Sequence, residues 1–282
     1  MEKINVLSLF DGISCGRVAL ERAGIQVGSY YASEIDRHAI KVSGNNYPDI
    51  IQIGDVTKWK EWDIDWSSID VVIGGSPCQS FSNIGNGEGL EGKSGLFFEF
   101  ADIVHQVLLS NPKANFLLEN VLMKKEWENI ITKIMGVEPI MIDSALVSAQ
   151  RRKRLYWTNI EGIEQPKDRS ILFKDSLYDL PFRPLIKSMN SIWGKTKRID
   201  GANSVNNLKS NTLTTRSSHP TQYIINENRD MCRLYSPNEY EELQTLPKDY
   251  TKGIINTERF KAIGNGWTVD VIAHIFRNIN KQ

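Results

Sequence analysis

The first half of the chain alternates short apolar runs with stretches in which apolar residues recur every three or four positions. The apolar runs predict strands over residues 4–10, 27–33, 50–53, 70–74 and 115–118, with further strand-like segments in 140–159. The amphipathic stretches predict helices over 17–23, 36–45 and 99–109. Strands and helices that alternate in this way predict an α/β fold with a mostly parallel sheet and helices on both faces.

The second half has a different pattern. Residues 165–221 are irregular and rich in Asn and Ser, and a helical pattern returns over 237–246 and 269–279. The change predicts a first domain over 1–160 that is completed by 226–282, and a small domain over 161–225. Residues 83–95 are rich in glycine and predict a mobile flap, although an ordinary flexible connection has the same composition.

The chain is neutral overall, but basic residues are concentrated in one segment. The 282 residues contain 34 Lys and Arg against 34 Asp and Glu, so the chain is not a bulk polycation. Asp200 is the only acid between Arg183 and Gln222. The basic residues in and around that stretch are Arg183, Lys187, Lys195, Lys197, Arg198, Lys209 and Arg216. This local patch suits phosphate contact, and a solvated loop face is the alternative.

The three cysteines, Cys15, Cys78 and Cys232, are too few and too scattered for a disulfide framework or a zinc site. The N-terminus lacks the pattern of a secretory signal, and no apolar stretch approaches the ~20 residues of a membrane span. We therefore expect a cytoplasmic protein without a bound metal.

Polar or glycine residues follow the first three predicted strands. Gly12 and Ser14 lie in a tight turn after the first strand, Glu34 ends the second, and Asp55 follows the third. A glycine turn at a helix N-terminus and a carboxylate at the next strand end are typical of adenosine-containing cofactor sites. Ordinary turn chemistry also uses Gly and Asp.

Cys78 follows the fourth predicted strand, in Gly-Gly-Ser-Pro-Cys-Gln. A free cysteine is usually a small buried hydrophobe. Next to proline and glycines, in front of the predicted flap, Cys78 is better interpreted as a nucleophile. An unperturbed thiol has a pKa of about 8.5, so a helix N-terminus or nearby arginines would have to stabilise the thiolate.

Two further segments carry candidate chemistry. Glu119 ends the strand predicted at 115–118, where a partly desolvated and protonated carboxyl group could donate to a ring nitrogen. A surface carboxylate is the alternative. In a strand, Gln150, Arg152 and Arg154 would share one face and converge on one site, whereas a plain basic patch is the alternative.

In this order, the motifs resemble those of the DNA (cytosine-5) methyltransferase family over nearly the whole chain. They are Phe10–Gly12, Glu34, Gly54-Asp55-Val56, Pro77-Cys78-Gln79, Leu96-Phe97-Phe98-Glu99, Glu119-Asn120-Val121, the Gln-x-Arg-x-Arg pattern of 150–154, the threonine segment 211–216, and Gly264-Asn265-Gly266. Phe-Asp-Gly-Ile, the short recognition segment and Gly-Trp-Thr-Val are most similar to the de novo-type branch and to small prokaryotic or phage relatives. Ser14-Cys15 and Gly266-Trp267 depart from the commonest family pattern.

The resemblance implies a Rossmann-like S-adenosylmethionine-dependent fold with a small target-recognition domain. It implies methyl transfer to C5 of cytosine in double-stranded DNA through base flipping and a covalent bond from Cys78 to C6. The implied catalytic residues are Cys78, Glu119, Arg152, Arg154 and Gln150. The implied cofactor contacts are Phe10, Gly12, Ser14, Glu34, Ile35, Asp55, Val56, Pro77, Leu96, Asn265 and Trp267, and the implied DNA contacts are Ser82, Lys195, Lys197, Arg198, Thr215 and Arg216.

The expected partners are double-stranded DNA and a cognate restriction endonuclease, and we expect a monomer or weak dimer. Two alternatives stay open at this point. One is a methyltransferase acting on cytosine in tRNA, and the other is a catalytically silent DNA-binding relative. A nicotinamide-dependent oxidoreductase is disfavoured, because the glycine loop is incomplete and Cys78 would have no role.

Overall fold

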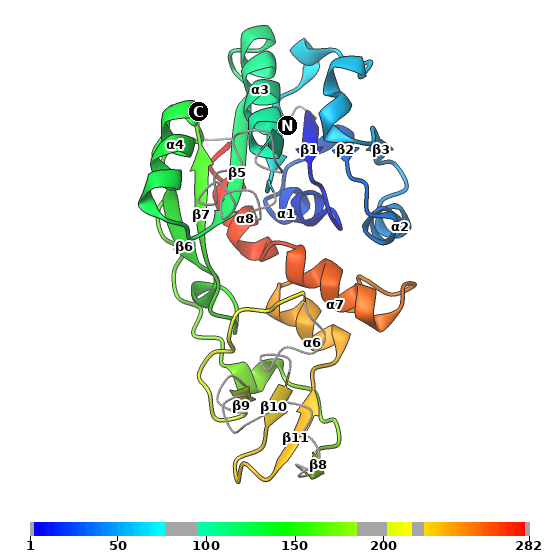
Figure 1. Cartoon of the computed structure of the whole chain (residues 1–282), viewed down its shortest axis with the longest axis vertical. Helices are drawn as coiled ribbons and strands as arrows, with labels where there is room; N and C mark the ends of the chain where they lie inside the picture. The colour runs from blue at the N-terminus through cyan, green and yellow to red at the C-terminus, as the bar shows by residue number, and fades with distance from the viewer. Residues whose placement is uncertain (1–2, 77–94, 185–201, 216–222, 280–282) are drawn as a thin grey trace, which may run out of the picture. The chain divides into compact units, whose positions relative to one another are not determined.

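The computed structural model of the chain describes residues 3–76, 95–184, 202–215 and 223–279 (Figure 1). The chain divides into two compact units. The sheet unit comprises Met1–Ile142, Lys153–Gln165 and Ile272–Gln282, and the second unit comprises Asp143–Arg152 and Pro166–Val271. These boundaries differ from the predicted ones, because residues 143–152 and 226–271 make their contacts within the second unit. What each unit does stays a prediction.

The sheet unit has seven strands in the order β3-β2-β1-β4-β5-β7-β6. They are β1 (Ile4–Leu9), β2 (Val27–Ser33), β3 (Ile51–Gln52), β4 (Val71–Gly74), β5 (Asn115–Val121), β6 (Ile140–Asp143) and β7 (Lys153–Thr158). The pairs from β3 to β5 are parallel, whereas β7 runs antiparallel to β5. The predicted α/β class with a mostly parallel sheet is confirmed.

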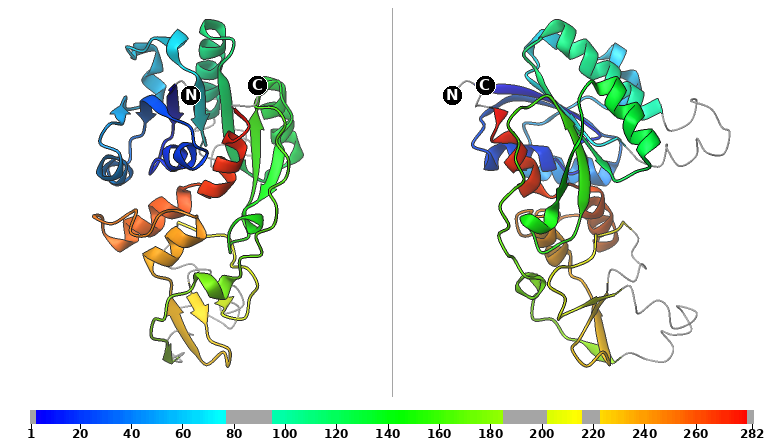
Figure 2. Two further views of the ribbon diagram at one scale, coloured as in Figure 1. Left: turned by 180° about the vertical axis from the view of Figure 1, so that it is seen from behind. Right: turned by 90° about the vertical axis from the view of Figure 1, so that its left-hand side faces the viewer.

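Helices cover both faces of this sheet, as Figure 2 shows for α3 and α4 on one side and α1 on the other. Among the described residues, the helices between these strands are α1 (Cys15–Arg22), α2 (Arg37–Asn46), α3 (Gly95–Ser110) and α4 (Lys125–Met135), with 3-10 turns at Val56–Glu61 and Trp66–Ser68. Leu7 and Leu9 of β1 pack in one buried cluster with Phe100 of α3 and Ile131 of α4. Leu7 and Leu9 point to one face of β1, and Val6 and Ser8, which point to the other, are buried as well, so both faces of β1 are covered.

Several elements extend beyond their predicted bounds. β5 continues three residues past 118 and so includes Glu119, and α3 begins at Gly95 and not at residue 99. The sequence pattern also failed to predict α4, whose apolar residues bury only one narrow face. The predicted elements are therefore of the right type, although β1, β3 and β4 are shorter than predicted.

The second unit contains a four-stranded sheet in the order β8-β11-β10-β9. Its elements are β8 (Arg183–Pro184), β9 (Asn203–Ser204), β10 (Tyr223–Ile225), β11 (Met231–Leu234), α6 (Pro237–Leu243), α7 (Asn256–Asn265), and 3-10 turns at Ser144–Leu146 and Phe173–Ser176. The last helix, α8 (Val269–Phe276), crosses from the second unit into the sheet unit. In the described parts of 165–221, namely 165–184 and 202–215, the prediction of an irregular segment holds except for β8, β9 and one 3-10 turn.

Buried ion pairs stabilise the second unit. The Arg233 guanidinium donates to the Glu239 carboxylate at 2.7 Å, and Arg259 donates to Glu241 at 2.9 Å. Both carboxylates are fully buried, so each needs its arginine to offset the loss of hydration. Glu239 also completes the capping box at the start of α6 with Ser236.

None of the described helices combines the length and the apolar character that a membrane-spanning segment needs.

Candidate active site

The loop after β1 forms a tight, left-handed path at the carboxyl edge of the sheet. Phe10, Gly12 and Ser14 all have positive φ, at 55°, 59° and 58°. Only Gly12 adopts this conformation without strain, which explains the glycine. The loop leads directly into the N-terminus of α1, where backbone amides favour anionic or polar ligands. The predicted turn after the first strand is therefore present.

Glu34 connects the ends of the first two strands. Its Oε2 accepts a hydrogen bond from the Gly12 amide at 2.8 Å, and its Oε1 accepts from the amides of Ile35 and Asp36 at 2.7 and 2.8 Å. A carboxylate can accept about four hydrogen bonds, so Oε2 retains capacity for a ligand hydroxyl group. Ile35 is 75% exposed, which is unusual for isoleucine and leaves an apolar surface beside that carboxylate.

Asp55 lies three residues after β3 and caps the 3-10 turn that follows. Its Oδ1 accepts from the amide and the hydroxyl group of Thr57, both at 2.9 Å. Its Oδ2 has no hydrogen-bond partner in the part of the chain that the structure describes, so it can accept from an amino group. Since β1, β2 and β3 are parallel neighbours, Gly12, Glu34 and Asp55 lie at one edge of the sheet.

Four other predicted cofactor contacts have structural roles. Ser14 is fully buried; its amide donates to the Asp11 backbone oxygen, and its hydroxyl group binds Asp11 and Ser43. The prediction of Ser14 as a cofactor contact is wrong, because none of its polar groups is directed to the surface. The side chains of Val56 and Leu96 pack against the hydrophobic core, as does part of Phe10.

Asp11 was missed by the sequence reasoning. Its carboxylate accepts hydrogen bonds from Ser8 Oγ at 2.6 Å, Tyr30 OH at 2.8 Å and Ser14 Oγ at 2.5 Å. Burial raises the pKa of Asp11 to about 6, against the lowering effect of these three hydroxyl groups, and the Glu34 carboxylate adds a smaller upward effect. Serines three residues before and after the aspartate were the available signal. These hydrogen bonds of the Asp11 carboxylate therefore stabilise the glycine loop.

Glu119 and Arg154 form an ion pair across β5 and β7. Arg154 Nε lies 2.8 Å from Glu119 Oε1, and the two side chains are 13% and 12% exposed. The antiparallel register places Arg154 opposite Val121 and Glu119 opposite Tyr156, so the pair is diagonal. Glu119 therefore lies within the strand and is largely buried. The protonated form that would donate to a ring nitrogen stays a prediction. Its carboxylate is oriented by the guanidinium group.

Gln150 and Arg152 do not lie on one strand face with Arg154, so that prediction is wrong. β7 begins at Lys153, and Gln150 instead forms an isolated bridge to Ser210. Arg152 is 4% exposed and donates to the backbone oxygens of Gly266, Gly264 and Leu213 at 3.0, 3.2 and 3.5 Å. Both residues belong to the second unit and contact its own loops.

The remaining predicted residues of the second unit lie near the surface. Thr215 and Asn265 are exposed, and Trp267 is half-buried after the end of α7. Arg183, in β8, is exposed and remains a candidate phosphate contact. Lys209 is different, because its ammonium group donates to the backbone oxygens of Ala145, Ser148 and Ile171 at 2.7, 3.0 and 2.7 Å. The prediction that Lys209 belongs to a phosphate-binding patch is therefore wrong.

Several predicted residues lie outside the described residues: Pro77, Cys78, Ser82, the flap residues 83–94, Lys187, Lys195, Lys197, Arg198 and Arg216. The residues just before Cys78 are described. Gly74 ends β4, and the Ser76 backbone oxygen accepts from Asn120 Nδ2 of β5 at 3.4 Å. A Cβ at Gly74 would lie 2.8 Å from both the Leu9 oxygen and the Phe100 ring, so only glycine fits there. The chain segment that leads to Cys78 thus leaves the carboxyl end of β4.

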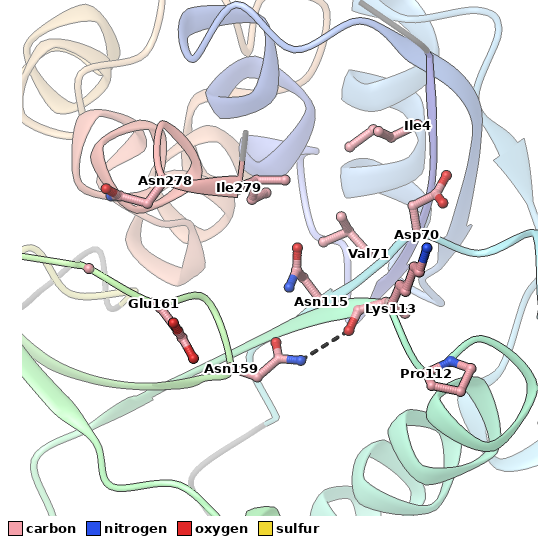
Figure 3. Close-up of a pocket in the computed structure, with 12 residues that line it drawn as sticks. Ile4, Asp70, Val71, Pro112, Lys113, Asn115, Asn159, Glu161, Asn278 and Ile279 are labelled. Atoms are coloured by element: carbon pink, nitrogen blue, oxygen red, sulfur yellow. Dashed lines mark hydrogen bonds between the residues drawn. The ribbon is translucent and has the colours of Figure 1, made fainter. Parts of the chain in front are cut away.

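Figure 3 shows a cavity of about 950 Å³ at the opposite, amino end of the strands. It is lined by the first residues of β1, β4 and β5, namely Ile4, Val71 and Asn115. Asn159 Nδ2 donates to the Ala114 oxygen at 3.0 Å beside it. It contains none of the predicted site residues. Ligands of open α/β sheets bind beyond the carboxyl ends, where the strand order reverses, and here the reversal lies between β1 and β4.

Comparison with solved structures supports the fold. The structure superimposes on a DNMT2 from Spodoptera frugiperda with a TM-score of 0.75 at 16% identity, over 99% of this chain and 100% of that one. It superimposes on the Entamoeba histolytica methyltransferase EhMeth with a TM-score of 0.73 at 15% identity, over 100% and 99% of the two chains. Identities this low establish the fold alone.

Comparison of sequences identifies the family. The chain is 28% identical to the type II methyltransferase M1.ScrFI of Lactococcus lactis subsp. cremoris, over 96% of this chain and 76% of that protein. It is 32% identical to the orphan methyltransferase M.SPRI of Bacillus phage SPR, over 65% of this chain but 42% of that longer protein. The family model of C-5 cytosine-specific DNA methylases matches residues 4–168 and 158–281. Because the family model matches almost the whole chain, the protein belongs to the C-5 cytosine-specific DNA methylase family.

Proposed function

We propose that the chain transfers a methyl group from S-adenosylmethionine to C5 of cytosine in double-stranded DNA. The observation that supports this most directly is the buried Glu119–Arg154 pair on β5 and β7. It lies in the same sheet as the β4 end that leads to Cys78. An oriented carboxylate, in the sheet whose β4 end leads to a predicted thiol nucleophile, suits addition to a pyrimidine ring.

The residues at the ends of β1, β2 and β3 fit the cofactor. Glu34 Oε2 can accept from a ribose hydroxyl group, Asp55 Oδ2 can accept from the adenine amino group, and exposed Ile35 offers an apolar surface for a flat ring. The Gly12 loop and the N-terminus of α1 would face the rest of the molecule. When bound, S-adenosylmethionine supplies an electrophilic methyl group.

Cys78 acts as the nucleophile in this proposal, because C5 of cytosine is too weak a nucleophile to react unaided. The thiolate bonds to C6, and the displaced electron pair makes C5 reactive. C5 then bonds to the methyl carbon, and the sulfur–methyl bond of the donor breaks. A base removes the C5 proton, and the electrons of that bond expel the thiolate and restore the ring.

Glu119 holds N3 and the exocyclic amine, and so stabilises the charge that develops as the thiolate adds. Arg154 acts through Glu119 by fixing its carboxylate. We assign Arg152 to the O2 carbonyl, with Gln150 as its support. Hydrogen bonds to three backbone oxygens hold the Arg152 guanidinium group in one orientation, which suits a positioned group.

The target base must leave the helix, because C5 and C6 are inaccessible in a stacked duplex. Unstacking costs a few kcal/mol, which contacts from the flap residues and the basic second unit would offset. The candidate phosphate contacts are Ser82, Arg183, Lys195, Lys197, Arg198, Thr215 and Arg216. A cognate restriction endonuclease stays a predicted partner, since the relative M1.ScrFI is a type II enzyme.

The decisive experiment uses duplex DNA that carries 5-fluorocytosine. Fluorine cannot leave as a proton does, so we expect a covalent adduct that survives denaturation with the wild-type chain and none with Cys78→Ser. Cys78→Ser should also lose methyl transfer while it retains DNA and cofactor binding. Normal turnover by Cys78→Ser would refute the covalent route.

A tRNA substrate is the competing candidate, because one branch of the family methylates tRNA and the fold is also that of a DNMT2. Tritiated methyl transfer to duplex DNA and to tRNA, measured side by side, separates the two. We expect label in DNA. Label in tRNA alone would replace the proposed substrate, and no label in either would favour the catalytically silent alternative.

A further inference from the structure

Gln244 lies outside every motif named above, yet its side chain is fully buried in the second unit. Its Oε1 accepts from Thr268 Oγ1 at 2.7 Å and from Gln150 Nε2 at 3.3 Å. Its Nε2 donates to the backbone oxygens of Ile263 and Gly266 at 3.0 and 3.1 Å. All four hydrogen-bonding positions of the carboxamide are therefore used, and no other natural side chain of this size offers the same set.

These bonds join Gln244 to Arg152 through a shared acceptor. The Gly266 oxygen that accepts from Gln244 also accepts from the Arg152 guanidinium at 3.0 Å. Moving this oxygen would move an anchor of the guanidinium group. A buried arginine that loses an acceptor either reorients or retains an unsatisfied donor.

Gln244 is also joined to Arg152 through Gln150. Gln150 Oε1 accepts from the Leu213 amide at 2.9 Å, and the Leu213 oxygen accepts from Arg152 at 3.5 Å. Gln150 Nε2 donates to the Leu243 oxygen at 3.1 Å as well as to Gln244. Gln150, Arg152 and Gln244, together with the backbone of Leu213 and Gly266, form what we call the carboxamide network.

We propose that Gln244 is a positioning residue, which fixes Gln150 and Arg152 in the orientation that the reaction requires. This inference rests on the proposed function, in which Arg152 holds the target ring and Gln150 supports it. Gln244 touches neither ring nor cofactor in this proposal. It acts only through the carboxamide network, and displacement of a group by about 1 Å can lower a rate about 100-fold.

The first test is Gln244→Met, which keeps the size of the side chain and removes its polar atoms. We expect kcat per folded molecule to fall about 30- to 100-fold, by the same reasoning about displacement. The KM for S-adenosylmethionine should change less than about threefold, because Gly12, Glu34 and Asp55 are untouched. A kcat within about twofold of the wild type would refute the positioning role.

Arg233→Met is the matched control for loss of stability. Arg233 belongs to the same unit and pairs with buried Glu239, so its loss destabilises that unit without touching the carboxamide network. We expect a Tm decrease at least as large as for Gln244→Met, with kcat per folded molecule near that of the wild type. An equal fall in kcat in both variants would show general loosening and overturn the proposal.

A double-mutant cycle supplies a readout that a general structural role would not produce. If Gln150 and Gln244 act as one unit, Gln150→Met combined with Gln244→Met should lower kcat no more than the worse single variant does. Losses that multiply would overturn the proposal. The wild-type rate in the same assay tests the proposed function separately: an active wild type beside a fully active Gln244→Met refutes the positioning role alone.

Discussion

The carboxyl edge of the sheet unit and the carboxamide network of the second unit hold their candidate residues by different means. At the edge, Glu34 directly follows β2 and Asp55 lies three residues after β3, and their main partners are amides within two residues or on the neighbouring loop. In the carboxamide network, Arg152 contacts backbone oxygens 61, 112 and 114 residues away in sequence. One arrangement is local and the other depends on loops that are distant in sequence.

The difference determines how each region responds to a substitution. Strand ladders fix the edge through many backbone hydrogen bonds, so no single side chain decides its shape. The segments around Leu213 and Gly266 belong to no strand, and buried side-chain groups hold them in place. We therefore expect damage at the edge to appear mainly as lost stability or cofactor affinity, and damage in the network as lost rate.

The largest expected effect comes from a glycine-to-alanine substitution made once in each region, which tests this comparison directly. In Gly74→Ala, the new Cβ would lie 2.8 Å from the Leu9 oxygen and the Phe100 ring, and in Gly264→Ala it would lie 2.9 Å from the Thr214 oxygen. We expect Gly74→Ala to lower the free energy of unfolding by about 1–3 kcal/mol, since paired strands cannot yield. Gly264→Ala should cost less, because alanine favours the helix by up to about 1 kcal/mol and an unpaired segment can shift.

Activity should rank the two glycine variants in the opposite order. A shift of Thr214 displaces the neighbouring Leu213 oxygen that holds Arg152, so Gly264→Ala should lower kcat more than tenfold, whereas Gly74→Ala at a permissive temperature should retain most of it. Thermal unfolding and single-turnover rates on the same preparations measure both. Equal rate losses would contradict the contrast between the two regions.

Local chemistry also decides what could be predicted from the sequence. Gly12, Glu34 and Asp55 were predicted because each follows an apolar run that is recognisable as a strand. Glu119 was found for the same reason, although β5 proved three residues longer. Its partner Arg154 was a candidate, but their pairing depends on the β5–β7 register, which no local pattern encodes.

Gln244 and Lys209 show where sequence reasoning stops. Gln244 lies at the end of an ordinary amphipathic helix, and only the fold reveals its four partners. The sequence predicts Lys209 in a basic patch, because a sequence shows the charge of a side chain and not the direction in which it points. Its three acceptors come from segments 38 to 64 residues away.

Lys209→Met tests that correction and has an intermediate expected effect. Burial lowers the pKa of Lys209, although Asp168 and Asp143 oppose this. The substitution leaves carbonyl groups without a donor, so we expect a loss of about 1–2 kcal/mol in the stability of the second unit. At a temperature at which Lys209→Met is folded, the slope of log K for DNA binding against the logarithm of the salt concentration should equal that of the wild type. An exposed control, Arg183→Met, should reduce that slope by about 1 if Arg183 contacts a phosphate.

The smallest expected effect comes from the ionisation of Asp11, which holds the glycine loop at the edge of the sheet. The carboxamides of the network do not ionise, so the two regions differ in this respect. Because the folded pKa of Asp11 is about 6 and the unfolded value is 3.8, the folded state retains a proton that the unfolded state releases between these values. The contribution of Asp11 to stability is therefore greatest at low pH and is lost as pH rises through 6. Partial exposure admits screening, so we expect about 1 kcal/mol, or a few degrees in Tm.

Thermal unfolding from pH 4.5 to 7.5, recorded for the wild type and Asp11→Asn, isolates this contribution because other titrations cancel in the difference. The Tm of the wild type relative to Asp11→Asn should fall as pH rises and level off above about 7, once the carboxyl group is ionised. Gln150→Met is the control, since a neutral carboxamide contributes no titration and its difference from the wild type should stay flat. A flat profile for Asp11→Asn would mean that the three hydroxyl groups fully offset burial, and the edge would then be as insensitive to pH as the network.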